Sequence, residues 1–184
     1  RGPDGRWWVL ADRTQAPSGV GYALESRVVL SRCLPELFRD FHVRRLANYF
    51  QAMHESLVAQ TNRENPRIVL LTSGPAGEGY FAHAYLARYL GYTLAEGGDL
   101  TTRDNRVYLK SVDGLKPVDL ILRRVDAEYC DPLELRTDSL LGVAGLLFYL
   151  TPLALHEVGY NPAAIGRAVM LYFVLVAVVN PLAS

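Results

Sequence analysis

The sequence is poor in cysteine and lysine and carries no net charge. Its two cysteines, Cys33 and Cys130, lie far apart and show no Cys-x-x-Cys or Cys/His spacing, which argues against a zinc site and favours a reduced intracellular protein. The only lysines are Lys110 and Lys116, so few residues could act as a lysine that contacts phosphate. A net charge of zero implies no global attraction to nucleic acid or to an anionic surface.

The 184 residues suffice for one domain with a real core, or for one domain and a piece of another. The sequence starts at Arg1, without a methionine and without the basic-then-apolar pattern of a secretion signal. We therefore expect it to begin within a longer protein.

The stretch DRTQAPSGVGYALESR, residues 12–27, is the strongest candidate for binding chemistry. It follows a GPDG turn signal and an aromatic and β-branched run, residues 7–10, that predicts a strand. A strand that leads into a loop rich in proline, glycine and polar side chains is a common binding element of α/β domains. The alternative is a polar turn between two strands.

A strand–loop–helix unit is expected further along the chain. Apolar residues at helical spacing predict an amphipathic helix over residues 43–60 that covers one face of a sheet, with His54 as a packing residue. The run Ile68–Leu71 predicts a strand buried on both faces, and Tyr80–Leu90 predicts a helix that ends at Gly91. The loop between them, which contains GPAGEG, lacks the Lys-Ser/Thr of a phosphate loop. It is therefore a weak phosphate signal or an ordinary connection.

Three more extended segments are expected after this helix. Residues 92–95 predict a short strand, and residues 106–111 and 118–125 predict a hairpin joined by Asp113-Gly114, with Leu120 and Leu122 on one face, which Val118 can share. The last strand ends in a charged segment that can form a binding rim or a solvated surface network. Its candidate rim residues are Arg123, Arg124 and Asp126.

The composition changes near the C-terminus. Residues 139–155 and 168–184 contain no charged residue, and a short Gly- and Pro-containing connection joins them. We favour a transmembrane helical hairpin over a pair of helices buried in a soluble core, because the second segment shows no amphipathic face.

Three long motifs carry a resemblance to a known family: WWVLADRTQAPSGVGYALESR, PRIVLLTSGPAGEGYFAHAYLARYLGYTLAEGGDL and VDLILRRVDAEYCDPLELR. From residue 2 to about 145 the sequence resembles the circularly permuted ATP-grasp type 2 family, related to glutathionylspermidine synthetase-like ligases. The resemblance implies an α/β fold with a partial ATP-grasp-like sheet and flanking helices. It also implies ATP-dependent joining of a carboxylate to an amine through an acyl phosphate, with ATP and Mg²⁺ as cofactors.

The resemblance further suggests which residues contact substrates and phosphate. These are Asp12, Arg13, Gln15, Ser18 and Gly19 toward the acid, and Glu78 toward the amine. Ala11 and Arg13 stand where related ligases have magnesium ligands, and neither side chain can coordinate magnesium, so the metal site stays unassigned. Gly77, Gly79 and Ser26 also depart from the expected residue types, which are larger polar side chains at the two glycines and Asn at position 26.

From about residue 145 the sequence instead resembles a helical hairpin of a major facilitator superfamily transporter. We therefore expect an ATP-grasp-like fragment over residues 1–138, in the cytoplasm, followed by an apolar helical hairpin over residues 139–184 that contacts or enters a membrane. The leading hypothesis is a fragment of a carboxylate–amine ligase that is inactive alone and acts on small-molecule substrates. The alternatives are a membrane protein fragment related to transporters and a non-catalytic binding module. The sequence leaves the acid, the amine and the oligomeric state undetermined.

Overall fold

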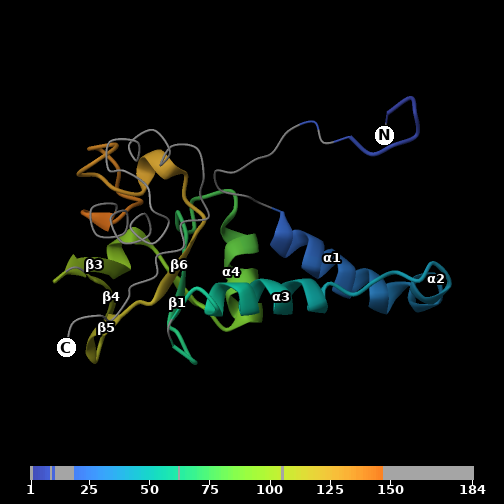
Figure 1. The fold of residues 1–184 in the computed structure, drawn as a ribbon, viewed down its shortest axis with the longest axis horizontal. Coiled ribbons are helices and arrows are strands. Elements are labelled where there is room, and N and C mark those ends of the chain that lie inside the picture. The colour runs from blue at the N-terminus through green and yellow to red at the C-terminus, as the bar shows by residue number, and fades with distance from the viewer. Residues whose placement is uncertain (1, 9, 11–18, 62, 105, 147–184) are drawn as a thin grey trace.

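The computed structural model describes residues 2–8, 10, 19–61, 63–104 and 106–146. Along the chain, three helices are followed by a strand–helix–strand unit, three antiparallel strands and a last strand that joins the first sheet, with two short 3-10 helices (Figure 1). In order they are α1 (Val20–Cys33), α2 (Pro35–Asp40), α3 (Ala47–Val58), β1 (Ile68–Leu71), α4 (Tyr80–Leu90), β2 (Thr93–Ala95), η1 (Gly97–Asp99), β3 (Leu100–Arg103), β4 (Arg106–Ser111), β5 (Gly114–Pro117), β6 (Leu120–Arg123) and η2 (Ala127–Tyr129).

The first sheet is parallel and has the order β2-β1-β6. All four residues of β1 and all four of β6 are buried, which confirms the prediction of a strand covered on both faces. Leu70, Leu120 and Leu122 pack on one face against α1, α3 and α4. Val69 and Ile121 pack on the other face against the second sheet. The parallel sheet is therefore the middle layer of the body of the molecule.

The second sheet is antiparallel and has the order β3-β4-β5. The predicted Asp113-Gly114 turn exists, but it pairs β4 with β5, as Ser111 lies opposite Gly114. The predicted partner, residues 118–125, was wrong, because β6 leaves the hairpin and pairs in parallel with β1. Val118 also packs on the opposite face from Leu120. The physical reason is burial: the apolar β6 covers both of its faces only between the two core layers.

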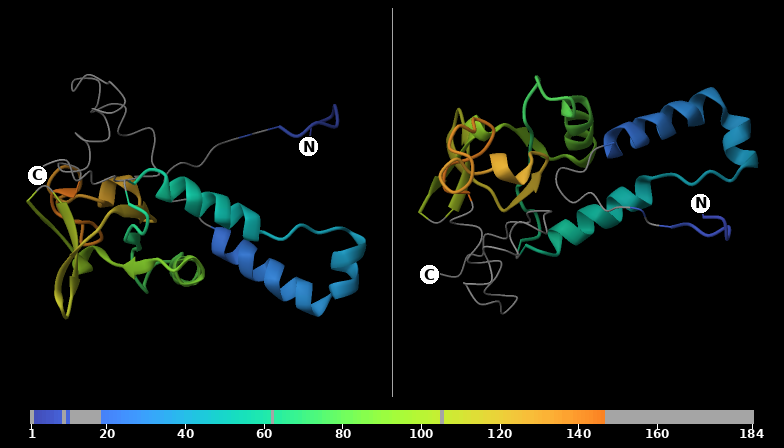
Figure 2. Two further views of the ribbon diagram at one scale, coloured as in Figure 1. Left: turned by 60° about the horizontal axis from the view of Figure 1, so that its bottom comes forward. Right: turned by 90° about the horizontal axis from the view of Figure 1, so that it is seen from above.

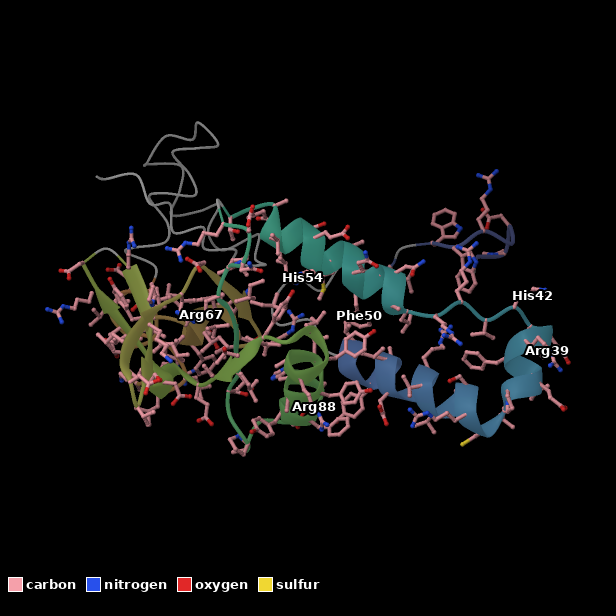
Figure 3. The ribbon with its side chains drawn as sticks, turned by 90° about the horizontal axis from the view of Figure 1, so that it is seen from below. Arg39, His42, Phe50, His54, Arg67 and Arg88 are labelled. Carbon is pink, nitrogen blue, oxygen red and sulfur yellow. The ribbon has the colours of Figure 1, made fainter. Side chains whose placement is uncertain are left out.

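The three helices α1, α2 and α3 form an arm that projects from the body, with α2 at its tip (Figures 1 and 2). The predicted helix over residues 43–60 is confirmed as the shorter α3, and it packs on the sheet as expected. Phe50 on α3 points back into the base of the arm (Figure 3). There it packs edge to face on Tyr89 of α4, with the two ring centroids 5.3 Å apart. His54 hydrogen-bonds with the Tyr92 hydroxyl at 2.9 Å, so it is a packing residue, as predicted.

The prediction of a strand at residues 7–10 was wrong for the residues that the structure describes. Trp7, Trp8 and Leu10 have no strand conformation, and Trp7 is 87% exposed. High intrinsic β-propensity does not form a strand unless a partner strand completes the hydrogen bonds. The GPDG turn before it is present, since the Gly5 amide donates to the Gly2 carbonyl at 2.9 Å.

The start of the predicted C-terminal hairpin is not an apolar helix. Residues 139–145 form bends and turns, and Val143 and Leu146 are buried in the core beside Cys130. The remainder of the predicted hairpin, residues 147–184, lies outside the described residues. Among the described helices, none combines the length and the apolar character that crossing a bilayer requires.

Candidate functional site

A cavity of about 720 Å³ lies at the carboxyl ends of the parallel strands β1 and β6. The chain runs from β1 through α4 to β2 on one side of β1, whereas β6 pairs on the other side. The connections therefore leave the neighbouring strands β1 and β6 in different directions. Open parallel sheets bind ligands at such a switch point. Two helices, α1 and α4, begin at the wall of this cavity.

The cavity wall combines small residues, two tyrosine rings and the side chains of a glutamate, a histidine, an arginine and an aspartate. It is formed by Gly19, Tyr22, Ser73, Ala76, Gly77, Glu78, Gly79, Ala82, His83, Arg124, Val125, Asp126, Tyr129 and Leu141. The loop after β1 and the segment after β6 supply most of these residues, because both strands end at the same edge of the sheet.

Two of the six residues predicted to contact substrates fall in the described part of the chain, and both line the cavity. Gly19 comes from the start of α1, and Glu78 comes from the loop before α4. Helix α1 packs on α4, with Gly21 against the Ala82 backbone, and this contact brings the two segments together. The other four predicted residues, Asp12, Arg13, Gln15 and Ser18, lie outside the described residues, as does Ala11.

The glycines that depart from the expected residue types occupy crowded positions. A Cβ atom at Gly79 would lie 2.8 Å from both Cε1 and Nε2 of His83. A Cβ atom at Gly77 would lie 2.2 Å from the Ser73 hydroxyl oxygen. These separations are shorter than van der Waals contact, so a larger side chain at either position requires its neighbour to move. The two glycines therefore let the His83 ring and the Ser73 hydroxyl approach the loop backbone.

His83 is a cavity residue that the sequence interpretation missed. It is 6% exposed, and its Nδ1 is 2.9 Å from the Thr72 hydroxyl oxygen at the end of β1. Burial, and then the positive charge of Arg124, lower the pKa of His83 to about 4, so the ring is neutral at pH 7. A signal was available: His83 follows Gly79 by one helical turn, which places both on the face of α4 that meets the loop.

The candidate rim divides into cavity residues and a core residue. Arg124 and Asp126 line the cavity, whereas Arg123 is 2% exposed and donates to the Val125 carbonyl oxygen. Arg124 is 8% exposed, and its guanidinium donates to the Arg123 carbonyl oxygen at 3.2 Å. Within the described residues, no carboxylate forms an ion pair with Arg124. Burial lowers the pKa of Arg124 from its ordinary value, and the adjacent Arg123 lowers it further against the opposite effect of Tyr49.

The cavity suits an anionic group better than a metal ion. The Arg124 guanidinium is buried without a counter-charge among the described residues, and α1 and α4 begin at the cavity wall; both features favour phosphate or carboxylate oxygens. Over the described ranges, no three of the side chains that ligate metals come together. Glu78 and Asp126 supply oxygen donors at the cavity, but these residues do not form a magnesium site by themselves.

The amino-acid sequence matches the circularly permuted ATP-grasp type 2 family over residues 1–152. This match continues past residue 145, where we expected transporter-like sequence to begin, and the resemblance to a transporter hairpin finds no support. An uncharacterized protein of Mycobacterium leprae is 44% identical over 149 residues, which cover 80% of this chain and 27% of the relative. An uncharacterized protein of Mycobacterium tuberculosis H37Rv is 45% identical over 147 residues, which cover 79% of this chain and 17% of the relative.

A more distant relative comes from a cyanobacterium. An uncharacterized protein of Synechocystis is 37% identical over 145 residues, which cover 78% of this chain and 30% of the relative. The matched part of this chain thus spans less than a third of each of these three relatives. The family match covers most of the chain and includes every described element, and so this protein belongs to the circularly permuted ATP-grasp type 2 family.

Proposed function

We propose that this chain forms the substrate end of an ATP-dependent carboxylate–amine ligase. The observation that supports this most strongly is that Gly19 and Glu78, from distant parts of the sequence, line one cavity at the switch point of a parallel sheet. Membership of an ATP-grasp family makes ligase-type chemistry the expected activity. In that chemistry ATP activates the acid as an acyl phosphate, and the amine then displaces the phosphate.

The chain's own residues would bind and orient the two substrates. Glu78 is exposed at the cavity, where its carboxylate can hold the ammonium group of an amine, and Asp126 offers a second carboxylate. Asp12, Arg13, Gln15 and Ser18 precede Gly19 and belong to the same proposal as contacts of the acid. No protein nucleophile is needed, since orientation and electrostatic stabilisation account for the rate.

The relatives are several times longer than the matched segment, so the complete activity is a property of the longer protein in this proposal. We expect the 184-residue chain alone to be inactive and to bind ATP weakly. Isothermal titration with ATP and magnesium measures this directly. Tight, magnesium-dependent binding of ATP to this chain contradicts the proposal that the complete site needs the longer protein.

The activity itself is testable with a full-length mycobacterial relative. We expect ADP release that requires both an acid and an amine when panels of small carboxylates and amines are added. In this chain, Glu78→Gln should weaken the binding of a diamine probe such as putrescine, whereas Glu36→Gln on the exposed α2 should not. ADP release that is independent of the amine, or equal effects of the two variants, contradicts the proposal.

A binding module that lacks catalysis is the second candidate. Two observations favour it. Ala11 and Arg13, which cannot coordinate magnesium, stand where related ligases have magnesium ligands, and the described residues contain no cluster of metal-ligating side chains. The two candidates differ in one measurement. A relative that binds its acid and amine but never releases ADP is a binding module.

A further inference from the structure

Arg124 is a buried cation whose charge no neighbour in the described structure balances. Its side chain lies at the end of β6 and lines the cavity at 8% exposure. Among the described residues, its guanidinium donates one hydrogen bond, to the carbonyl oxygen of Arg123 at 3.2 Å. Glu78 and Asp126 line the same cavity without forming an ion pair with it. A buried charge without a partner is costly for folding, so such a residue is retained more readily when a ligand supplies the missing charge.

His83 presents a hydrogen-bond donor to the same cavity. The Thr72 hydroxyl oxygen accepts a hydrogen bond from the Gly74 amide at 3.4 Å and lies 2.9 Å from Nδ1 of His83. We assign the Thr72 hydroxyl as the donor to Nδ1, because Thr72 is fully buried and, among the described residues, this ring nitrogen is the acceptor within reach of its O–H. The imidazole is neutral, so its proton is then on Nε2. Nε2 is one of the two atoms that a Cβ at Gly79 would touch, at the cavity wall.

The starts of two helices add backbone donors. Helix α1 has 14 residues and begins after Gly19, and α4 has 11 residues and begins after Gly79. Neither N-cap glycine provides a side-chain cap. The Tyr80 amide at the start of α4 donates to the Gly77 carbonyl oxygen at 3.1 Å, and the next two amides of that turn have no acceptor among the described residues. The buried Arg124 guanidinium, which has no ion-pair partner among the described residues, is the independent observation that makes these helix starts part of a site.

We propose that the inner end of this cavity binds an oxyanion, a carboxylate or a phosphate, through the Arg124 guanidinium and the Nε2–H of His83. The exposed carboxylates of Glu78 and Asp126 lie at the same cavity and repel a second anion there. The ligand class is therefore a small molecule with an oxyanion at one end and an amine, or no charge, at the other. This inference specifies a ligand group for the site of the proposed function, but anion binding can be tested without any ligase activity.

The test is a titration of the full 184-residue chain with inorganic phosphate and, separately, with succinate, at constant ionic strength. Side-chain ¹⁵N chemical shifts of Arg124 and His83 report binding at the inner end, and Arg88 serves as the reference. Arg88 is exposed on α4 and points away from the sheet (Figure 3). We expect at least one probe to shift the Arg124 and His83 signals and to leave the Arg88 signal unchanged. The probe that binds more tightly identifies the oxyanion as phosphate or carboxylate.

Three variants locate the effect. Arg124→Gln should lower the affinity for the probe that binds more tightly by about tenfold or more. Arg124→Lys should lower it by less, because a lysine keeps the charge but loses the planar two-point contact. Arg88→Gln removes the same charge from the surface and should leave the affinity within about twofold of the parent chain. The Arg124→Lys variant keeps the test decisive if Arg124→Gln does not fold. Unchanged affinity in the folded Arg124 variants, or no shift of the Arg124 and His83 signals with either probe, overturns the proposal.

Discussion

The two ends of the parallel sheet both bury charged side chains, but Asp119 at one end has an ion-pair partner, whereas Arg124 at the other has none among the described residues. At the amino end, the carboxylate of Asp119 accepts the Arg67 amide at 2.7 Å and pairs with Arg63 at 3.3 Å. At the carboxyl end, Arg124 has one neutral acceptor and, within the described structure, no ion pair. Removing one partner of a buried, paired charge is strongly destabilising, whereas a buried charge without a partner favours a ligand. The amino end is structural, and the carboxyl end carries the candidate site.

The largest expected effect is at the amino end. Asp119→Ala leaves the Arg67 amide and the Arg63 guanidinium without their acceptor, and it should lower the free energy of unfolding by about 3 kcal/mol. Urea denaturation measures the change. Asp119→Asn keeps an oxygen for the Arg67 amide and should cost less. Equal stability of the Ala variant and the parent chain would show that the amino end is not a structural charge site.

Acid should destabilise the protein through His83 at the carboxyl end. The unfolded chain binds the imidazole proton near pH 6.5, but the folded chain does not bind it until about pH 4, because burial opposes the charged form. The stability from neutral His83 is therefore complete above pH 6.5 and declines as the pH falls toward 4. The loss should be about 2 kcal/mol. Between these pH values, the unfolding temperature should fall more steeply with decreasing pH in the parent chain than in His83→Gln. An equal dependence on pH in the two proteins counts against this role of His83.

Alanine at Gly79 tests the packing that positions His83. The added methyl group meets the imidazole at 2.8 Å and should cost about 1–2 kcal/mol, because the ring is held by Thr72 on its other side. Gly98→Ala is the matched control, as nothing lies within 4 Å of a Cβ there. Chemical denaturation of both variants gives the difference. A stable Gly79→Ala variant with an unshifted His83 signal contradicts the close approach.

The smallest effect should come from Arg124 itself. Arg124→Gln removes a buried charge that has no ion-pair partner in the described structure, so the free energy of unfolding should stay the same or rise by about 1 kcal/mol. This outcome contrasts with Asp119→Ala, although both variants remove a buried charge. A loss in Arg124→Gln as large as in Asp119→Ala removes the distinction between the two ends of the sheet.

Much of the middle of the fold could be predicted from local patterns. The strand Ile68–Leu71 and the helix Tyr80–Leu90 occur with the predicted bounds, and Gly91 ends the helix in the left-handed conformation at φ 72°. These elements are defined by short-range rules of burial, periodicity and capping. The strand at residues 7–10 and the hairpin partner of residues 106–111 were wrong, because strand pairing depends on distant segments that no local pattern identifies.

The candidate site was only partly predictable for the same reason. Glu78 and Gly19 were chosen by resemblance, and the structure places both at one cavity, although their contacts with substrate stay a prediction. The interpretation of residues 123–126 as one rim did not separate Arg124 from Arg123. Alternation along a strand places neighbours on opposite faces, but which face meets a cavity depends on the layers packed around the sheet.

The sequence by itself determined the family, the buried parallel strands and the helix that follows the glycine-rich loop, since these depend on residue types within a few turns of chain. Only the tertiary structure decided that β6 joins β1, that α1 packs on α4 beside the cavity, and that Arg124 is buried without an ion-pair partner within the described residues. The physical reason is that a charge becomes chemically informative through its burial and its neighbours, and both arise when distant segments meet.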